Sequence, residues 1–295
     1  MTYRCVDQLQ REAGGIAPIC EPLGVSRSGS YASRQRLQKP RQLSAVETQV
    51  VATFMASGRS YGSRRVRAAL AVQGTIAGRN RVRTIMREQG LRPVWRRQFV
   101  HTTDSKHDLP VASHVLNRQF DPVETNKAWV ADLTSIRTRS GWLYLAAVMD
   151  LFSREIVGWA MAPSMPAEWM CEALRLAIGQ RGVGPDLIMH SDRGSQYASD
   201  LHRDLLDRHG IKASMSRKGN CWDNSVMERF FLSLKMERVW HQDYANQAEA
   251  GKDIADYIVG FYNQIRLHSK LRYQSPNAYE QAMAEKGLIE VSEKT

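Results

Sequence analysis

The sequence has no long apolar segment. No stretch of its 295 residues approaches the ~20 consecutive apolar residues that a membrane-spanning helix needs. The opening residues, MTYRCVDQLQREAGG, also lack the apolar run of a secretory signal. We therefore expect a protein that stays in the cytosol and does not act in a membrane.

Cysteines are few and widely separated. The four are Cys5, Cys20, Cys171 and Cys221. They form no C-x-x-C pair, which argues against both a disulfide framework and a zinc knuckle. The histidines His101, His107 and His114 have no cysteine pair with which to complete a tetrahedral zinc site, so we interpret them as residues of a connecting segment.

Positive charge is confined to one end of the chain. Residues 1–125 contain 20 Lys and Arg against 9 Asp and Glu, whereas residues 126–295 contain 21 of each kind, so the net charge of +11 belongs to the first part. A localised basic excess is typical of a protein that binds a polyanion, because neutralising phosphates releases condensed counterions. Nucleic acid is therefore the expected partner.

Two helical modules are expected in this basic part. Residues 1–40 have apolar residues at helical spacing, then Gly24, which permits a turn, and Ser26, which can cap the next helix. The apolar residues are Ile16, Ile19, Cys20 and Leu23. This pattern is typical of a helix-turn-helix, with a plain helical hairpin as the alternative.

The second module covers residues 41–100. Apolar residues mark three helices within residues 46–55, 66–70 and 82–86, and arginines crowd the polar faces with almost no acidic residues between them. Such density suits contact with a phosphate backbone, although a charged face is often only solvated. The candidate DNA contacts in this module are Arg64, Arg65, Arg67, Arg79, Arg81 and Arg83.

Beyond an expected connector at residues 101–121, the apolar pattern changes period. It predicts strands at 129–137, 142–152, 155–161, 186–190 and 211–215, and helices at 166–180, 198–209 and 225–240. The order βββαβαβα with mixed strand directions is that of an α/β ribonuclease-H-like fold. We therefore expect a catalytic core with C-terminal helices over residues 122–285, a tail over 286–295, and N-terminal all-α helix-turn-helix modules.

Three acidic residues fall at informative places in this layout. Asp132 lies within the first predicted strand, Asp192 follows the fourth, and Glu228 lies in the first turns of the last helix. The 35 residues between Asp192 and Glu228 prove little alone, since acids are common in the chain. However, Asp132 lies in the apolar run WVADLTSI, where an uncompensated carboxylate is costly to bury.

Each acid also has a structural interpretation. In this interpretation, Asp132 is a charged residue on an edge strand, and Asp192 is a turn residue before Arg193-Gly194. Glu228 stands three residues after Ser225, the spacing of a helix capping box. Each of these interpretations predicts a structure that can be checked.

Phosphodiester chemistry explains why three carboxylates would be gathered. Two divalent ions ~3.5–4 Å apart can activate an attacking oxygen and stabilise a leaving oxygen, and carboxylates are suitable ligands for Mg²⁺. Lys235, seven residues after Glu228, projects from the same helix face and is a candidate phosphate contact. The basic loop before the helix supplies further candidates, namely Arg217, Lys218 and Asn220.

With these residues in place, the sequence resembles the insertion-sequence transposases of the IS3 family, and specifically their second-reading-frame product with its retroviral-integrase-like core. The runs that carry the resemblance are WVADLT, HSDRGSQY, SRKGNCWDNSVMERFF with SLKME, and YNQIRLHS. The family's Asp-Asp-Glu residues match Asp132, Asp192 and Glu228, and its basic residue two helical turns on matches Lys235. Arg272 departs from the family, which often has glycine there, and puts a tight turn before Ser275-Pro276 in doubt.

The resemblance implies an enzyme that needs Mg²⁺ or Mn²⁺, as two ions, and that cleaves transposon ends and transfers the strands to a target. It also implies double-stranded DNA as partner, in the form of terminal inverted repeats and target, and homo-oligomers in a synaptic complex. A first-reading-frame protein, or a frameshift fusion with it, would be a further partner. The sequence has no sustained heptads of its own.

Two other hypotheses are compatible with parts of the sequence. A ribonuclease-H-like nuclease would cut DNA without joining it, and the two N-terminal modules argue against such an enzyme because they suit a protein that selects its site. A DNA-binding regulator with an inactive core would not need a complete set of catalytic acids. All three acids are present here, which argues against this hypothesis.

Overall fold

The computed structural model describes Val6, Leu9 and residues 16–38, 43–94, 111–164, 167–184, 186–217 and 221–292. The chain divides into two compact units, Met1–Gln49 and Val50–Thr295, each of which is described by itself. Within the described ranges, no helix has both the length and the apolar character that crossing a membrane requires.

In the described residues of the first unit, two helices lie on either side of a tight turn. They are α2 (Ala17–Cys20) and α3 (Arg27–Gln38). Gly24 has the left-handed φ of +61° that the turn requires, and the Ser26 hydroxyl accepts a hydrogen bond of 3.0 Å from the backbone N–H of Gly29. The expected turn and cap are thus present. Ile16, Ile19 and Cys20 are buried with Val6, whereas Leu23 is exposed.

Three helices follow in the order that the apolar spacing predicts. They are α4 (Ala45–Ala56), α5 (Ser63–Val72) and α6 (Arg79–Glu88). A reciprocal capping box begins α4, because the Ser44 N–H donates to the Glu47 carboxylate at 2.8 Å and the Glu47 N–H donates to the Ser44 hydroxyl at 3.3 Å. The buried apolar residues of these helices in the second unit are Val50, Phe54, Val66, Leu70, Val82, Ile85 and Met86.

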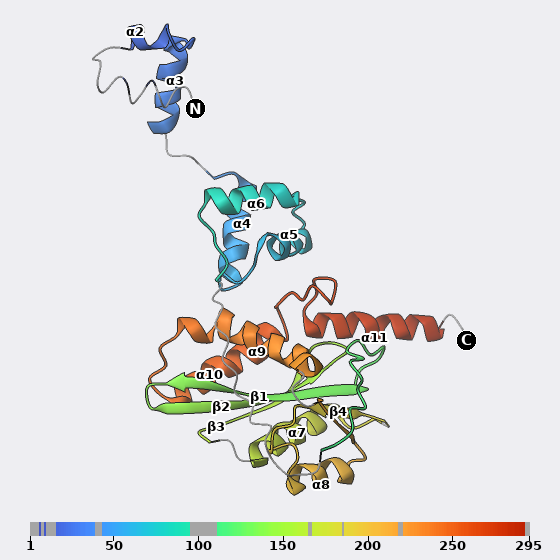
Figure 1. Ribbon diagram of the computed structural model, residues 1–295. Helices are drawn as coiled ribbons and strands as arrows, with labels where there is room; N and C mark the ends of the chain where they lie inside the picture. The colour runs from blue at the N-terminus through green and yellow to red at the C-terminus, as the bar shows by residue number, and fades with distance from the viewer. Residues whose placement is uncertain are drawn as a thin grey trace. The chain divides into compact units, whose positions relative to one another are not determined.

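A five-stranded mixed sheet forms the centre of the second unit (Figure 1). Its strands are β1 (Ala128–Thr138), β2 (Gly141–Asp150), β3 (Ile156–Ala162), β4 (Ile188–Ser191) and β5 (Lys212–Met215). The spatial order is β3-β2-β1-β4-β5, with β1, β2 and β3 in an antiparallel meander. β4 runs parallel to both β1 and β5. The predicted meander, the order of strands and helices along the chain and the mixed strand directions are confirmed.

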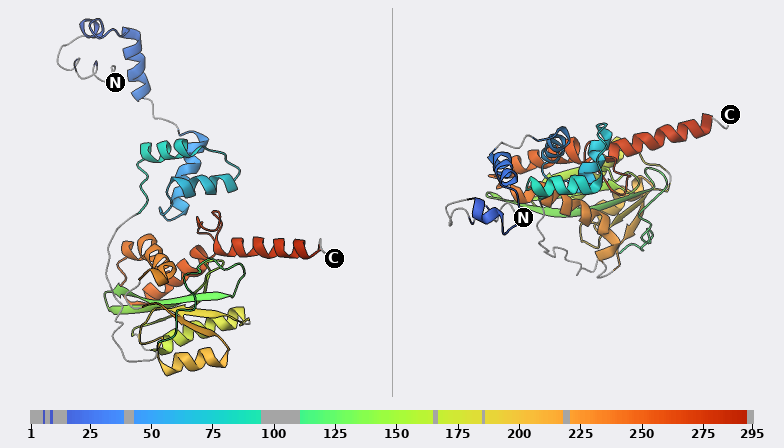
Figure 2. Two further views of the ribbon diagram at one scale, coloured as in Figure 1. Left: turned by 45° about the vertical axis from the view of Figure 1, so that its right-hand side comes forward. Right: turned by 90° about the horizontal axis from the view of Figure 1, so that it is seen from above.

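Helices cover both faces of the sheet (Figures 1 and 2). On one face lie α7 (Ala167–Arg181) and α8 (Asp200–Arg208), and on the other lie α9 (Ser225–Glu237) and α10 (Gln247–Asp256). Side chains alternate along β1, so Val130 packs in the α9 layer and Trp129 and Ala131 in the α7 layer. This three-layer arrangement is a ribonuclease-H-like fold, as the element order predicted.

Short helical turns complete the core. They are η1 (Cys221–Asn224), η2 (Val239–His241) and the π-helical η3 (Tyr257–Tyr262). The last helix, α11 (Pro276–Ser292), continues past the expected tail boundary at residue 285. A tight turn precedes it after all, because Arg272 and Tyr273 adopt left-handed φ angles of 53° and 61°. The doubt that Arg272 raised about this turn was therefore unfounded.

The described half of the expected connector packs against the core. Leu116 is buried, and its backbone N–H donates to the Ser214 hydroxyl at 3.0 Å. The ring of His114 lies edge-on to that of His190, with 5.2 Å between centroids. Residues 111–121 are therefore part of the core surface, and His114 is not a free linker residue. His101 and His107 lie outside the described residues.

Candidate active site

The sheet register brings Asp132 and Asp192 to the same level on neighbouring strands. Val130 on β1 pairs with His190 on β4, and each acid follows its paired residue by two positions in the same direction. Burial, and then repulsion by Asp192, raises the pKa of the Asp132 carboxyl well above its ordinary value. Asp132 on β1 and Asp192 directly after β4 thus lie at the same end of two adjacent parallel strands.

The alternation of β1 also decides which face Asp132 occupies. Asp132 has the same parity as Val130 and Ile136, which pack in the layer of α9. α9 is held on that layer by Met227, Phe230, Phe231 and Leu234, all buried, while Glu228 stays exposed. Glu228 lies close enough to raise the pKa of Asp132 further. The third acid therefore faces the first from the adjacent helix.

Lys235 belongs to the same neighbourhood. Burial lowers the pKa of the Lys235 ammonium, and the Asp132 carboxylate acts in the opposite direction. In turn, Lys235 is the nearby positive charge that lowers the pKa of Asp132. Asp192, Glu228 and Lys235, which come from distant segments of the sequence, thus all influence the Asp132 carboxyl.

The capping-box interpretation of Glu228 is not supported. α9 begins at Ser225, so the cap position belongs to Asn224, which makes no side-chain capping bond. The Asn224 amide instead donates to the backbone carbonyl of Ala131 at 3.3 Å. This bond fastens the start of α9 to β1, directly beside Asp132.

A buried acid that sequence reasoning missed holds the loop before α9. Asp223 accepts hydrogen bonds from the Arg217 backbone and guanidinium, each at 3.0 Å, and from Arg118 at 2.7 Å. The Arg217 guanidinium, then its backbone N–H, and Arg118 hold the pKa of the Asp223 carboxyl well below its usual range. Arg217, a candidate DNA contact, is thus engaged with Asp223, while Lys218 and Asn220 lie outside the described residues. The signal in the sequence was the Asp-Asn pair directly before the helix.

The candidate DNA contacts of the second module differ in exposure. Arg64, Arg67, Arg79, Arg81 and Arg83 are exposed. Arg65 is only partly exposed, and its guanidinium lies 3.8 Å from the Glu237 carboxylate and over the ring of Tyr61. The exposed five are thus available to a partner, whereas Arg65 faces the core.

The carboxylate oxygens of the three acids are the kind of ligand that a hard divalent cation prefers. The raised pKa of Asp132 reflects burial and like-charge repulsion, and a bound cation would relieve that repulsion. Among the described residues, no three His, Cys, Asp or Glu side chains stand close enough together to form a ready-made metal cage.

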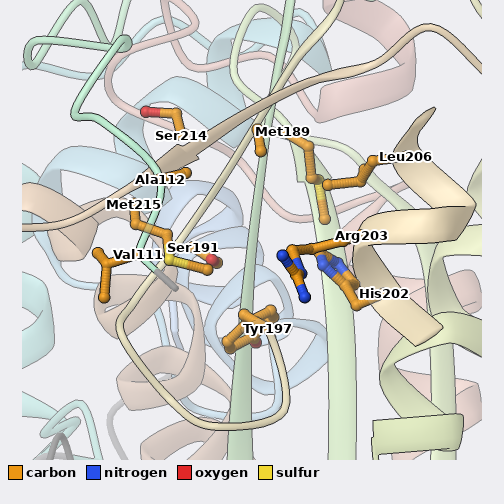
Figure 3. Close-up of a pocket in the computed structure, with 11 residues that line it drawn as sticks. Val111, Ala112, Met189, Ser191, Tyr197, His202, Arg203, Leu206, Ser214 and Met215 are labelled. Atoms are coloured by element: carbon orange, nitrogen blue, oxygen red, sulfur yellow. The ribbon is translucent and has the colours of Figure 1, made fainter. Parts of the chain in front are cut away.

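A cavity of about 170 Å³ lies elsewhere, between β4, β5 and α8 (Figure 3). Met189, Leu206 and Met215 line it, together with Tyr197 and His202. The Tyr197 hydroxyl and both His202 ring nitrogens are buried there without a hydrogen-bond partner among the described residues. None of the three acids, all of which are described, lines the cavity. Burial, and then the charges of Asp132 and Asp192, raises the pKa of the Tyr197 hydroxyl in its wall, so the cavity borders the candidate active site.

The sequence matches protein-family models over most of the second unit. Residues 122–221 and residues 209–276 match two models, each described as an integrase core domain. Residues 42–99 match an HTH-like domain. The matches fall on the mixed sheet with its following helices and on the three-helix module.

Solved structures of similar fold include retroviral integrase cores. The HTLV-2 integrase catalytic core domain in complex with magnesium, in its trimeric form, is 16% identical with a TM-score of 0.42, and the match covers 54% of this chain and 98% of that one. The core domain of BIV integrase is 19% identical with a TM-score of 0.41, covering 55% and 98%.

Two relatives match nearly end to end. The 31 kDa protein of insertion element IS600 from Shigella sonnei is 42% identical over 265 residues, which is 89% of this chain and 97% of the relative. The transposase InsF of insertion sequence IS3A from Escherichia coli (strain K12) is 36% identical over 284 residues, covering 95% and 98%. The chain therefore belongs to the IS3 family of insertion-sequence transposases, enzymes of DNA transposition whose integrase core domain is that of polynucleotidyl transferases.

Proposed function

We propose that Asp132, Asp192 and Glu228 hold two divalent ions, Mg²⁺ or Mn²⁺, and that the chain uses them to cut transposon ends and join them to a target. The observation that supports this proposal is the influence of Asp192, Glu228 and Lys235 on the buried Asp132 carboxyl, together with the register that pairs β1 with β4. Bound ions would activate an attacking oxygen and stabilise a leaving oxygen. The chain's own residues then bind and orient the DNA.

Both steps are displacements at phosphorus. In cleavage, a water oxygen bonds to phosphorus, the bond to the 3′-oxygen breaks, and a free 3′-hydroxyl remains with a 5′-phosphate. In joining, that 3′-hydroxyl attacks a target phosphodiester and displaces a target 3′-oxygen. Neither step needs a nucleophilic side chain, and Lys235 would hold a phosphate beside the acids.

The basic residues would hold DNA along two regions. In the HTH-like module, the exposed Arg64, Arg67, Arg79, Arg81 and Arg83 suit phosphate contacts. Near the acids, Lys235 and the loop with Arg217, Lys218 and Asn220 would guide the reacting strand. Arg217 would do so with the part of its side chain that Asp223 leaves exposed, since 49% of that side chain is accessible.

The expected partners follow from the same proposal. The substrates are the terminal inverted repeats and a double-stranded target, brought together by several copies of the chain in a synaptic complex. A first-reading-frame protein or a frameshift fusion would add end recognition. The chain would act in the bacterial cytoplasm, at the nucleoid.

An assay with end-labelled terminal-repeat DNA tests the proposal. Incubation with Mg²⁺, with the first-frame protein added where needed, should produce both nicked ends and strands joined to a second DNA. Chelation by EDTA should remove both products, and Mn²⁺ should restore them. Nicks without joined strands would favour the alternative, a ribonuclease-H-like nuclease. Binding without either product would contradict the proposed chemistry.

A further inference from the structure

A buried polar cluster links the HTH-like module to the catalytic helix α9. We call it the Tyr61 clasp: Tyr61 and Arg65 from the module, Glu237 from α9, and Arg266 with its neighbours Ile265 and Leu267. All of these residues lie in one compact unit, Val50–Thr295. Neither the acids nor the exposed arginines of the proposed function belong to it.

Tyr61 makes the most specific contact of the clasp. Its hydroxyl donates to the carbonyl of Ile265 at 3.3 Å and accepts from the N–H of Leu267 at 2.8 Å. The side chain is almost wholly buried, with 4% of the residue exposed. The Tyr61 hydroxyl thus both donates and accepts a hydrogen bond on one backbone segment, and the two bonds together fix where the side chain lies on that segment.

Glu237 is the shared acid. It accepts from the Arg266 Nε and Nη2 at 2.7 Å each and from the Tyr257 hydroxyl at 2.7 Å. Arg65 approaches the same carboxylate to 3.8 Å. Burial alone would lower the pKa of the Arg266 guanidinium, but Glu237 raises it above the ordinary value, so Arg266 stays charged.

Arg65 contacts Glu237 at a longer distance than Arg266 does, 3.8 Å against 2.7 Å. Burial, and then the nearby charge of Arg266, lowers the pKa of its guanidinium, while Glu237 acts in the opposite direction. Its interaction with Glu237 is therefore what compensates the desolvation of Arg65. This arrangement explains why Arg65 points to the core while Arg64 and Arg67 on the same helix are exposed.

The position of Glu237 makes the clasp relevant to catalysis. Glu228 and Lys235 lie on the same helix, α9, and Glu228 is nine residues earlier, about 13 Å along the axis. A helix transmits a displacement at one end to the other because its backbone is internally hydrogen-bonded. Contacts at Glu237 thus act on the element that carries the third acid.

We propose that Tyr61 and Arg65 are positioning residues that dock the DNA-binding module on α9, so that DNA held by the module is aligned with the acids. Arg65 is then a docking residue and not a DNA contact. This inference rests on the proposed function for its catalytic consequence, but the docking itself does not depend on metal chemistry. The two parts can therefore be tested separately.

Distance measurements on the full chain test the docking. Nitroxide labels carried by unnatural amino acids at Ile76 and Val123, both highly exposed, report the separation of module and core without using the native cysteines. We expect one narrow distance distribution, which broadens in Tyr61→Phe/Arg65→Ala and stays narrow in the matched control Arg64→Ala. A broad distribution in the unsubstituted chain, or no change in the double variant, would overturn the proposal.

Strand joining tests the consequence. The double variant should bind terminal-repeat DNA with an affinity within twofold of that of the unsubstituted chain, and should join it about tenfold more slowly. The single variant Arg65→Lys, which keeps Tyr61 and a positive charge at position 65, should keep most of the joining rate. A parallel loss of affinity and rate would instead make Arg65 a DNA contact and overturn the proposal. Failure of the metal chemistry would abolish joining in every variant while leaving the distance result intact, so the two failures are distinguishable.

Discussion

The Asn224 side chain donates a hydrogen bond of 3.3 Å to the backbone carbonyl of Ala131, one residue before Asp132. This bond joins the start of the helix that carries Glu228 to the strand that carries Asp132. Asn224 is buried, so no solvent competes for the contact. The separation of the two acids therefore depends on an amide that is not itself one of the candidate ligands.

Replacing Asn224 by Ala should affect activity more than stability. The lost hydrogen bond should lower the free energy of unfolding by about 1 kcal/mol, whereas strand joining should fall about tenfold because α9 is no longer fixed beside Asp132. Urea unfolding and a joining assay measure the two effects. Asn246→Ala is the control, because Asn246 caps α10 and its loss costs a similar ~1 kcal/mol away from the acids. Equal activity of the two variants would refute the positioning role.

Gly158 on β3 should tolerate no side chain. A Cβ there would lie 2.2 Å from the carbonyl oxygen of Ala173 and 2.7 Å from the backbone nitrogen of Ala177, so α7 would have to move away from the sheet. We expect Gly158→Ala to lower the free energy of unfolding by about 3 kcal/mol. Gly179→Ala, on α7 with open space around it, should change stability by less than ~1 kcal/mol. Thermal or urea unfolding distinguishes them, and a small effect at Gly158 would mean that α7 packs less closely than described.

His202 should make stability depend on pH. Its ring is buried, and burial lowers its pKa from 6.5 to about 4. Between these values the unfolded chain binds the proton and the folded chain does not, so stability is complete above pH 6.5 and declines as the pH falls towards 4. The contribution amounts to about 3 kcal/mol at most.

The variant His202→Phe should flatten this decline, since phenylalanine keeps the ring contact with Tyr197 but does not titrate. Urea unfolding between pH 4.5 and 7.5 measures the slope. The exposed His209, replaced by Gln, is the control and should leave the slope unchanged. A slope that is the same in His202→Phe and the unsubstituted chain would show that His202 titrates normally.

Arg67 and Arg65 should differ in the salt dependence of DNA binding. Each phosphate contact contributes about 0.9 to the slope of log affinity against log salt. Arg67 is exposed, so Arg67→Ala should reduce the slope by about that amount, whereas Arg65→Ala should not change it because Arg65 faces Glu237. Fluorescence anisotropy over a range of salt concentrations measures both. A reduced slope for Arg65→Ala would return Arg65 to the set of DNA contacts.

Local pattern was enough to predict the core. Runs of apolar, β-branched and aromatic residues in the sequence predict the strands β1, β2 and β3. The alternation of side chains around Val130 also predicts which face of β1 carries Asp132. Sequence could not predict contacts between distant segments. Arg65 and Arg217 look like their exposed neighbours in the sequence, and only the folded chain pairs them with Glu237 and Asp223.

Two further local features could not be decided from the sequence. Ser225 and Glu228 have the spacing of a capping box, but the preceding turn η1 moves the cap position to Asn224. Residues 111–121 have a polar composition typical of a linker, yet a single buried side chain, Leu116, and its bond to Ser214 hold the segment on the core. In both cases tertiary contacts decide what local propensity leaves open.

The central claim is that Asp132 is part of a metal-dependent site for strand cleavage and joining. Asp132→Asn keeps the shape of the side chain but removes its charge, and should reduce joined and nicked products by at least about 10³-fold, because a ligand to the ions is lost. The control is Asp207→Asn, an exposed acid on α8, which should leave both products unchanged. The direct measurement is the rate of joining of labelled terminal-repeat DNA in Mg²⁺ by the two variants, at equal DNA occupancy. A rate for Asp132→Asn close to that of the control would contradict the account.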